Sequence, residues 1–462
     1  MRVIGSCRCG LVALAGVLWL LTATAPSVAA VQAAIAPGAA AVQAMAEPPA
    51  SDEPAIVTDP TSPTATSQEA FDPEKATEAY LATLDEETRA KSKEYTEGGY
   101  WLGIISLFYG LAVAFFLLNT GLSARMRETA ERISGKKPLQ TVLYGVQYIL
   151  ITTVLLLPLS VYAGFIRERR YGFSTQSLGG YVSDRFIGLA ISLVLVSVLL
   201  VLLYGAIRRA PRTWWVWGAG VSLAFLAVVA FISPVYLAPL FNRYEPLDEG
   251  SLKDRVLAMA RANGVPADEV YQYDASKRTT KISANVSGFL GTTRISLNDN
   301  LLDRGTDEEI EAVVAHEIGH FVLHAVREFF VFFGIVLVVG FVFVRWGFDR
   351  ALARWGSTWG VRDVGDVAGL PLFLVLFSLY SVAISPITNG FIRASEVEAD
   401  IYGLNAAREP DGFSTIILKL GEYRKVDPGP LEEWLFYDHP SARNRILMSM
   451  RWKAENLDES SD

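Results

Sequence analysis

The stretch Ala312–Val326, AVVAHEIGHFVLHAV, places three histidines and a glutamate in a segment that otherwise resembles a buried helix. His316 and His320 are four residues apart, so a helix carries both imidazoles on one face, one turn apart. Glu317 points to the flank, where a carboxylate can reach a metal-bound water without binding the metal itself. The spacing predicts a zincin-type site with His316 and His320 as zinc ligands and Glu317 as the catalytic base.

His324 is the third histidine of this stretch. It lies eight residues beyond His316, about 12 Å further along a straight helix at 1.5 Å per residue, so it cannot share one ion with both other imidazoles. The longer zincin motif also requires a glycine turn that is missing here. We expect His324 either to support the ligand residues without binding the metal or to be structural.

A third ligand is expected from NGFIRASEVEADIYG, which begins at Asn389. Asn389, Arg393, Glu396 and Asp400 follow one another at steps of four, three and four, which puts them on one face of a helix. The pattern predicts Glu396 as the third zinc ligand and Asp400 as an outer carboxylate that accepts a ring N–H from a ligand histidine, with Asn389 and Arg393 beside them. A helix with a solvated acidic face is the alternative.

The remaining histidine, His439, lies in FYDHPSARNRI together with Arg445. With no metal role left to fill, both side chains are expected to stabilise a developing oxyanion. The alternative is an ordinary surface loop before a C-terminal helix.

Composition indicates a membrane protein. Hydrophobic residues make up 51% of the 462 residues, charged residues 19%, and the mean hydropathy is +0.29. The net charge of −8 provides no basic footprint for nucleic acid. The 2 cysteines, Cys7 and Cys9, lie near the N-terminus, so the rest of the chain has neither disulfides nor a thiolate metal site.

Apolar runs predict about six membrane spans, most of them longer than the roughly 20 residues that cross a bilayer. The fifth run is expected to continue the helix that carries the histidines. The six runs are Tyr100–Ser123, Thr141–Ile166, Phe186–Ile207, Trp214–Leu240, Phe329–Val344 and Val367–Phe391.

The expected fold class is an α-helical multi-pass membrane protein with an α+β zincin-like domain interrupted by two membrane helices. The first soluble part should contain a helix over Ser251–Ala262, a β-hairpin turning near Gly288–Thr292, and a capping box of Thr306 and Glu309. The expected segments are a signal peptide or signal anchor (1–32), a disordered Ala/Pro/Ser/Thr linker (33–73), an amphipathic helix (Glu74–Tyr95) and four spans (74–241), the first zincin part (242–328), two spans (329–391) and the second zincin part (392–462).

Two arguments disagree about which side of the membrane carries the catalytic segments. The loops Ala124–Gln140, Arg208–Arg212 and Arg345–Asp366 are basic and fall on one side of a six-span arrangement. The positive-inside rule makes that side cytoplasmic and the catalytic side extracytoplasmic, as an exported leader also would. Arg167–Arg170 adds positive charge to the opposite side. We favour the extracytoplasmic side, in a bacterial inner membrane.

Taken together, these residues resemble the type I CAAX prenyl endopeptidases, integral-membrane gluzincins with an HExxH…ExxxAD signature. The similarity runs from about Tyr100 to Met450 and rests on HEIGH, NGFIRASEVEAD and HPSARNR. The resemblance implies one zinc ion on His316, His320 and Glu396, with Glu317 as general base and acid. It also implies that Asp400 holds a ligand histidine without binding the metal, and that His439 and Arg445 contact the substrate or the transition state. Members of this family usually present their catalytic domain to the cytosol.

The resemblance further implies that an edge strand before the hairpin binds the substrate peptide by β-augmentation. The family commonly has Asn-Ala-Tyr in this strand. Here the frame is ISANVSG, with Ser283 in place of the usual asparagine, followed by Ala284 and Asn285. This departure concerns specificity rather than chemistry.

The expected function is a membrane-embedded zinc metalloendopeptidase that processes peptides or membrane proteins at the lipid bilayer, in processing or quality control. An inactive membrane scaffold or a transporter is the alternative. Transporters normally carry ionisable residues inside their spans, and the six apolar runs are essentially free of them.

Overall fold

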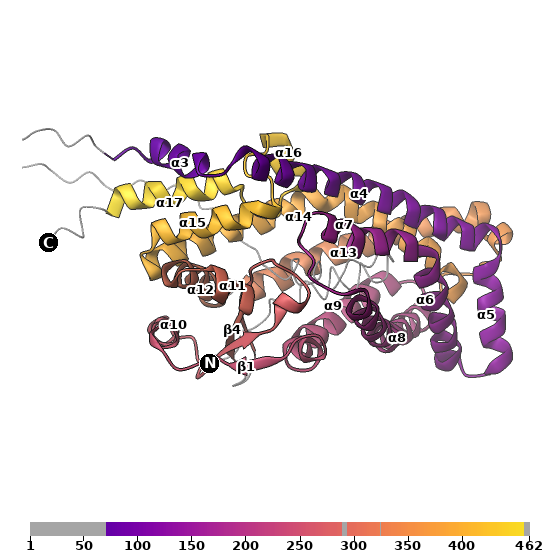
Figure 1. Ribbon diagram of the computed structural model, residues 1–462. Helices are drawn as coiled ribbons and strands as arrows, with labels where there is room; N and C mark the ends of the chain where they lie inside the picture. The colour runs from indigo at the N-terminus through magenta and orange to yellow at the C-terminus, as the bar shows by residue number, and fades with distance from the viewer. Residues whose placement is uncertain (1–70, 289–292, 324, 457–462) are drawn as a thin grey trace, which may run out of the picture.

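Six long apolar helices dominate the computed structural model, which describes residues 71–288, 293–323 and 325–456. Each is long and apolar enough to cross a membrane, and together they confirm the six predicted spans. Figure 1 shows the sheet and most of the shorter helices gathered at one end of these long helices, with α5 (Leu122–Ile133) at the opposite end. The candidate spans are Glu86–Asn119 (α4), Lys137–Arg170 (α6, Lys137–Val161, through α7, Arg167–Arg170), Leu178–Arg209 (α8), Trp214–Leu240 (with α9, Trp214–Ile232), Ala325–Trp359 (α13) and Val367–Ala407 (with α14, Leu370–Ala407).

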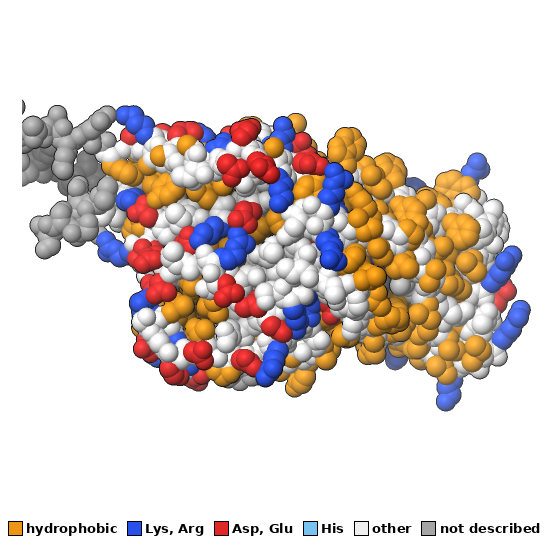
Figure 2. Space-filling model, in the orientation of Figure 1, with side chains coloured by type: hydrophobic (Ala, Val, Ile, Leu, Met, Phe, Trp, Pro, Cys, Tyr) orange, Lys and Arg blue, Asp and Glu red, His pale blue; other side chains and the backbone are white. Residues whose placement is uncertain are grey.

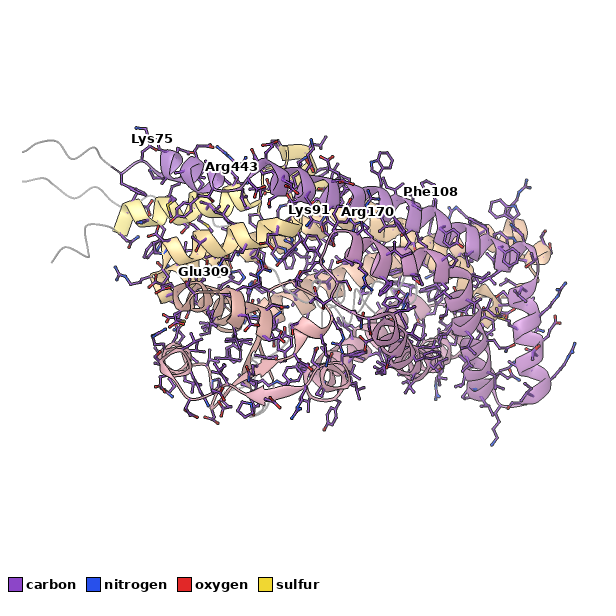
Figure 3. The ribbon with its side chains drawn as sticks, in the orientation of Figure 1. Lys75, Lys91, Phe108, Arg170, Glu309 and Arg443 are labelled. Atoms are coloured by element: carbon purple, nitrogen blue, oxygen red, sulfur yellow. The ribbon has the colours of Figure 1, made fainter. Side chains whose placement is uncertain are left out.

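The surface divides along the same direction. Figure 2 shows hydrophobic side chains covering the bundle, while acidic and basic side chains mix over the other end of the molecule. Phe108 of α4, with 65% of its surface exposed, projects outward from this apolar region (Figure 3). Apolar side chains exposed in this way are stable against lipid tails and costly against water.

Two expectations about helix boundaries are wrong. The single amphipathic helix expected over Glu74–Tyr95 is instead α3 (Pro73–Ala82), followed by α4, which runs without a break into the first span. The helix with the histidines, α12 (Asp307–Val322), ends before α13 begins at Ala325, so it does not continue into the fifth span. The predicted leader and most of the linker lie outside the described residues, as does His324.

The end of the bundle away from the sheet is held by a buried ion pair. Helix α5 (Leu122–Ile133) links the first two spans there (Figure 1). Arg127 Nη1 lies 2.6 Å from Asp366 Oδ2 and donates to the Gly360 carbonyl at 2.7 Å. These contacts join α5 to the connection between the last two spans.

The sheet follows the expected hairpin and adds two strands. Its order is β1 (Tyr244–Pro246), β2 (Val270–Tyr273), β4 (Arg294–Asn298) and β3 (Ala284–Ser287), with β2 and β4 parallel and the other pairs antiparallel. The pairing of Val286 with Ile295 fixes the hairpin register, while the turn residues 289–292 lie outside the described residues. Strand β3 is therefore at the edge of the sheet.

Shorter helices complete the soluble parts. The helix α10 (Ser251–Ala262) has the predicted bounds, and α10, α12 and the sheet share one apolar core. The remaining helices are α11 (Asp299–Arg304), α15 (Pro410–Leu420), α16 (Pro430–Phe436) and α17 (Ala442–Asn456).

Helix α3 packs against α17, so the segment before the first span and the C-terminal helix lie at the same end of the molecule. Leu81 of α3 is buried in a core shared with Ile446 and Met450 of α17. Glu78 pairs with Arg443, and Figure 3 shows Arg443 of α17 beside α3. Both ends of the described chain thus meet on the side of the bundle that carries the sheet.

Candidate metal centre

Helix α12 begins with the predicted capping box. The backbone N–H of Thr306 donates to Glu309 Oε2 at 2.8 Å, and the N–H of Glu309 donates back to Thr306 Oγ1. Lys419 of α15 also donates to Glu309 Oε2 at 2.6 Å. These contacts fix the start of the helix, and its buried face then carries His316 and His320.

Two glycines let α12 and α14 approach unusually closely. A Cβ added to Gly403 of α14 would lie 2.9 Å from the His316 backbone nitrogen, and one added to Gly319 of α12 would lie 3.1 Å from the Ala399 carbonyl oxygen. A side chain at either position would force the helices apart. The imidazoles of α12 therefore face the carboxylates of α14 across a nearly bare backbone contact.

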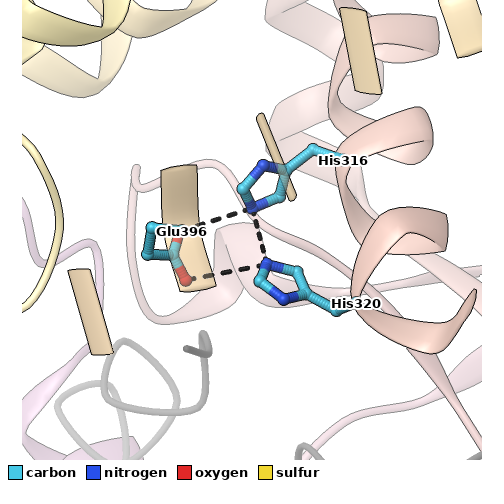
Figure 4. A group of neighbouring side chains, drawn as sticks. All are labelled: His316, His320 and Glu396. Atoms are coloured by element: carbon cyan, nitrogen blue, oxygen red, sulfur yellow. Dashed lines mark hydrogen bonds and ion pairs between the residues drawn. The ribbon is translucent and has the colours of Figure 1, made fainter. Parts of the chain in front are cut away.

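This approach brings together the three predicted ligands (Figure 4). His316 Nε2 lies 3.0 Å from His320 Nε2 and 3.4 Å from Glu396 Oε2, and His320 Nε2 lies 3.6 Å from Glu396 Oε1. All three side chains are buried. In the part of the chain that the structure describes, they form a group of metal-binding side chains with their ligand atoms within 4.8 Å of one another.

The buried polar atoms of this group favour a positive charge beside them. Both carboxylate oxygens of Glu396 are buried and accept no hydrogen bond from the described residues. Such a buried, unsatisfied carboxylate is costly unless a positive charge meets it. Burial alone lowers the pKa of His316, but the carboxylates of Asp400 and Glu396 outweigh it and raise that pKa to about 9. The surroundings thus favour positive charge where the three ligand atoms converge.

Asp400 connects this group to the C-terminal helix. Its Oδ1 lies 2.6 Å from His316 Nδ1, as predicted for a carboxylate behind a ligand histidine. Arg445 of α17 donates to the same carboxylate through Nε at 2.8 Å and through Nη2. The guanidinium is therefore bound to Asp400, a contact that the sequence did not suggest.

His439 also reaches the centre, with Nε2 3.4 Å from Glu396 Oε2. Asn389 Nδ2 donates to the Leu435 carbonyl at 2.9 Å, and Arg393 Nη1 donates to the Glu433 carbonyl at 2.9 Å. Asn389 and Arg393 therefore hold the segment that leads to His439 rather than contacting the imidazoles directly.

The predicted substrate strand lies against the helix that carries His316 and His320. Strand β3 contains Ala284 and Asn285 and packs against α12, whereas Ser283 directly precedes the strand. The N–H of Ser283 donates to Asn298 Oδ1 at 3.0 Å, which fixes the start of β3 against β4. The opposite edge of β3 faces away from β4.

Sequence reasoning missed Gly319, Gly403 and Asp438. Glycine inside HEIGH and again in the third-ligand helix is the signal that could have indicated a close contact between the helices. Asp438 directly precedes His439, and its carboxylate contacts that imidazole. Adjacent residues seldom face each other, so spacing alone gives no signal for this pair.

Comparisons with known proteins agree with this geometry. Residues 246–450 match the model of peptidase family M48, and residues 70–243 match the model described as CAAX prenyl protease N-terminal, five membrane helices. The latter region contains four of the six candidate spans described above.

Individual relatives align over most of both chains. An uncharacterized metalloprotease of Bacillus subtilis is 30% identical over 375 residues, covering 81% of this chain and 87% of that protein. CAAX prenyl protease 1 of Saccharomyces cerevisiae is 25% identical, with coverage of 79% and 86%. The crystal structure of S. mikatae Ste24p superposes with a TM-score of 0.66 at 23% identity, covering 82% of this chain and 95% of that one, and so shares the fold.

The predicted fold class and enzyme class are thereby confirmed, and the buried His-His-Glu group lies inside the region that matches the peptidase model. The long apolar helices and the membrane-helix model together establish several passes through a membrane. The chain therefore belongs to the M48 family of metallopeptidases and is an integral, multi-pass membrane protease.

Proposed function

We propose that the chain is a zinc endopeptidase whose metal is held by His316, His320 and Glu396. The observation that carries the proposal is the convergence of two imidazole nitrogens on a buried carboxylate without hydrogen-bond donors. Two atoms each about 2.0–2.1 Å from a tetrahedral zinc ion are roughly 3.3 Å apart. The separations of 3.0, 3.4 and 3.6 Å between the ligand atoms fit this value.

A zinc ion held by these three side chains would lower the pKa of a bound water to about 7 and polarise a carbonyl. Glu317 takes the proton of the attacking water and delivers it to the leaving amine. Glu317 directly follows His316 on α12, so the helix directs its carboxylate to the flank of the two histidines, where it can reach a metal-bound water without binding the metal.

His439 is proposed to stabilise the negative oxygen that forms on the scissile carbonyl. Arg445 takes a different role from the one expected from sequence, because two of its nitrogens already donate to Asp400. Asp400 in turn orients the imidazole of His316 and leaves Nε2 facing the metal. Asp400 and Arg445 are therefore positioning residues.

The substrate is proposed to be an extended peptide that pairs with the outer edge of β3, close to the membrane surface. Glu396 follows the apolar run that ends at Phe391 by five residues, roughly 7–8 Å along α14. Membrane-anchored chains can reach a centre at this height. The name of the yeast relative, CAAX prenyl protease 1, suggests prenylated CAAX segments as substrates, and membrane-protein processing or quality control is the broader class.

The catalytic side is proposed to be extracytoplasmic, in a bacterial inner membrane. The basic loops expected on the cytoplasmic side include α5, at the end of the bundle away from the metal centre (Figure 1). Helix α3 packs on α17, so an exported leader would carry the catalytic parts to the same side as α3. A reporter fused after Asp462 should be active outside the cytoplasm. Activity inside would reverse this assignment.

Replacing Glu317 by Gln tests the proposed chemistry. The variant keeps the shape of the side chain but cannot accept a proton, so peptide cleavage should be lost while one zinc ion per chain is retained. The purified protein in lipid vesicles would be assayed with casein and with a prenylated peptide, and its metal content measured. Retained cleavage, or loss of zinc in this variant, would refute the assignment.

A further inference from the structure

Asp438 contacts the imidazole that faces the metal centre. The Nδ1–H of His439 donates to Asp438 Oδ1 at 2.7 Å, while Nε2 on the other side of the ring points to Glu396. His439 is buried, whereas the Asp438 carboxylate is partly exposed. Asp438 thus approaches the ring from the solvent side, opposite the ligand group.

The backbone around this pair is fixed by other residues. Tyr437 is held on one side, because its carbonyl accepts from Arg393 and its hydroxyl donates to the Lys425 carbonyl at 3.0 Å. On the other side, the N–H of Ser441 donates to Glu433 Oε1 at 2.8 Å. The chain path therefore does not depend on the Asp438 side chain, which leaves that carboxylate to act on the ring.

We propose that Asp438 is a positioning residue that orients His439 and directs its Nε2–H toward the oxygen of the scissile carbonyl. This inference rests on the proposed role of His439 as an oxyanion donor. The outer torsion of a histidine side chain is broad and roughly two-fold, so packing alone holds the ring loosely. A hydrogen bond at Nδ1 selects one ring orientation and determines which nitrogen faces the reaction.

The same contact fixes which ring nitrogen faces outward. A carboxylate only accepts, so the ring donates its Nδ1–H to Asp438 and turns Nε2 toward Glu396. Arg424 Nη2 lies 3.6 Å from Asp438 Oδ1 on the outer side. This ion pair steadies the carboxylate without contacting the imidazole.

The experiment compares Asp438→Ala, Asp438→Asn and the matched control Asp427→Ala in the full chain in lipid vesicles. Asp427 is an exposed aspartate in the connection before α16, whereas Asp438 lies in the connection that follows this helix. Asp438→Ala should lower kcat about tenfold to a hundredfold with little change in KM, because the orientation of a group that stabilises the transition state is lost. Asp438→Asn keeps an acceptor for Nδ1–H and should retain more activity, and Asp427→Ala should match the unmodified protein.

A double-mutant cycle with His439→Ala separates positioning from a structural role. If Asp438 acts through the imidazole, Asp438→Ala should change the activity of the His439→Ala variant by less than about twofold. The inference would be overturned if Asp438→Ala lowered the activity by the same factor in the unmodified protein and in the His439→Ala variant. It would also be overturned if Asp427→Ala lowered the activity as much as Asp438→Ala does. Full activity of His439→Ala would overturn it as well while leaving the zinc chemistry intact. Failure of the peptidase proposal itself would show separately, as cleavage that survives in the Glu317→Gln variant.

Discussion

Replacing Gly403 by Ala should impair metal binding more than it impairs folding. The added Cβ would lie 2.9 Å from the His316 backbone nitrogen and 3.1 Å from its Cα, well inside ordinary contact of about 3.4–4 Å. Both partners are backbone atoms in the middle of helices, so no side chain can rotate away. Helices α12 and α14 must separate by at least about 0.5 Å.

The two consequences of that separation differ in size. Overpacking costs about 1–3 kcal/mol, but alanine is about 1 kcal/mol better than glycine inside a helix, so the net loss of folding stability should be at most about 2 kcal/mol. Metal sites tolerate deviations of only about 0.2 Å in ligand distance. A shift of about 0.5 Å between the helices that carry His316 and Glu396 should therefore weaken zinc binding about tenfold or more, and lower cleavage with it.

Gly390→Ala on the same helix is the matched control, because the nearest atom to its added Cβ is Arg393 Nη2 at 3.7 Å, an ordinary contact. Zinc affinity would be measured by competition with a chelator, stability by thermal unfolding and activity by peptide cleavage. The control should be neutral or slightly stabilised. Normal zinc affinity in Gly403→Ala, or equal losses in Gly390→Ala, would refute the role of the glycine contact.

Three further predictions concern the outer carboxylate, the metal and the opposite end of the bundle. Asp400→Asn should lower zinc affinity about tenfold to a hundredfold, since His316 loses a charged partner at Nδ1; unchanged affinity in chelator competition would contradict this. Removing the metal with a chelator should abolish cleavage and lower the midpoint of thermal unfolding. Adding zinc at about a thousand times its Kd should restore about 4 kcal/mol of folding stability, and an unfolding midpoint that does not change with zinc would exclude a resident ion. Arg127→Ala should destabilise the protein by about 3–5 kcal/mol, because it leaves Asp366 buried and unpaired, while zinc affinity stays the same; a loss of zinc affinity would show that the two ends of the bundle are coupled.

The spans and the pairing of His316 with His320 could be predicted from sequence because their signals are local. Apolar length identifies a span, and a separation of four residues places His316 and His320 on one face of any helix. Glu396 followed from the same periodicity, although it lies far along the chain from both histidines. Each of these inferences needs only the geometry of a single element.

Features that depend on two elements could not be predicted in this way. The break between α12 and α13 lies in a stretch without glycine or proline, so the usual signals for a helix end are missing there. The partner of Arg445 is set by how α17 packs on α14, and the importance of Gly403 depends on the backbone that faces it. Packing between helices is a tertiary property, and the sequence of one helix does not identify the residues of the helix that packs against it.

The edge position of β3 has a consequence for the choice of substrates. A peptide that joins this strand must offer its own backbone N–H and C=O groups, and a segment wound into a helix has already committed them internally. A helical client of the proposed kind would therefore have to unwind before cleavage, and the equilibrium population of its unwound form would set the rate where opening is fast relative to cleavage. The cleavage rate would then depend on how readily each substrate unfolds locally. The enzyme would leave stably folded proteins uncleaved without recognising their side chains.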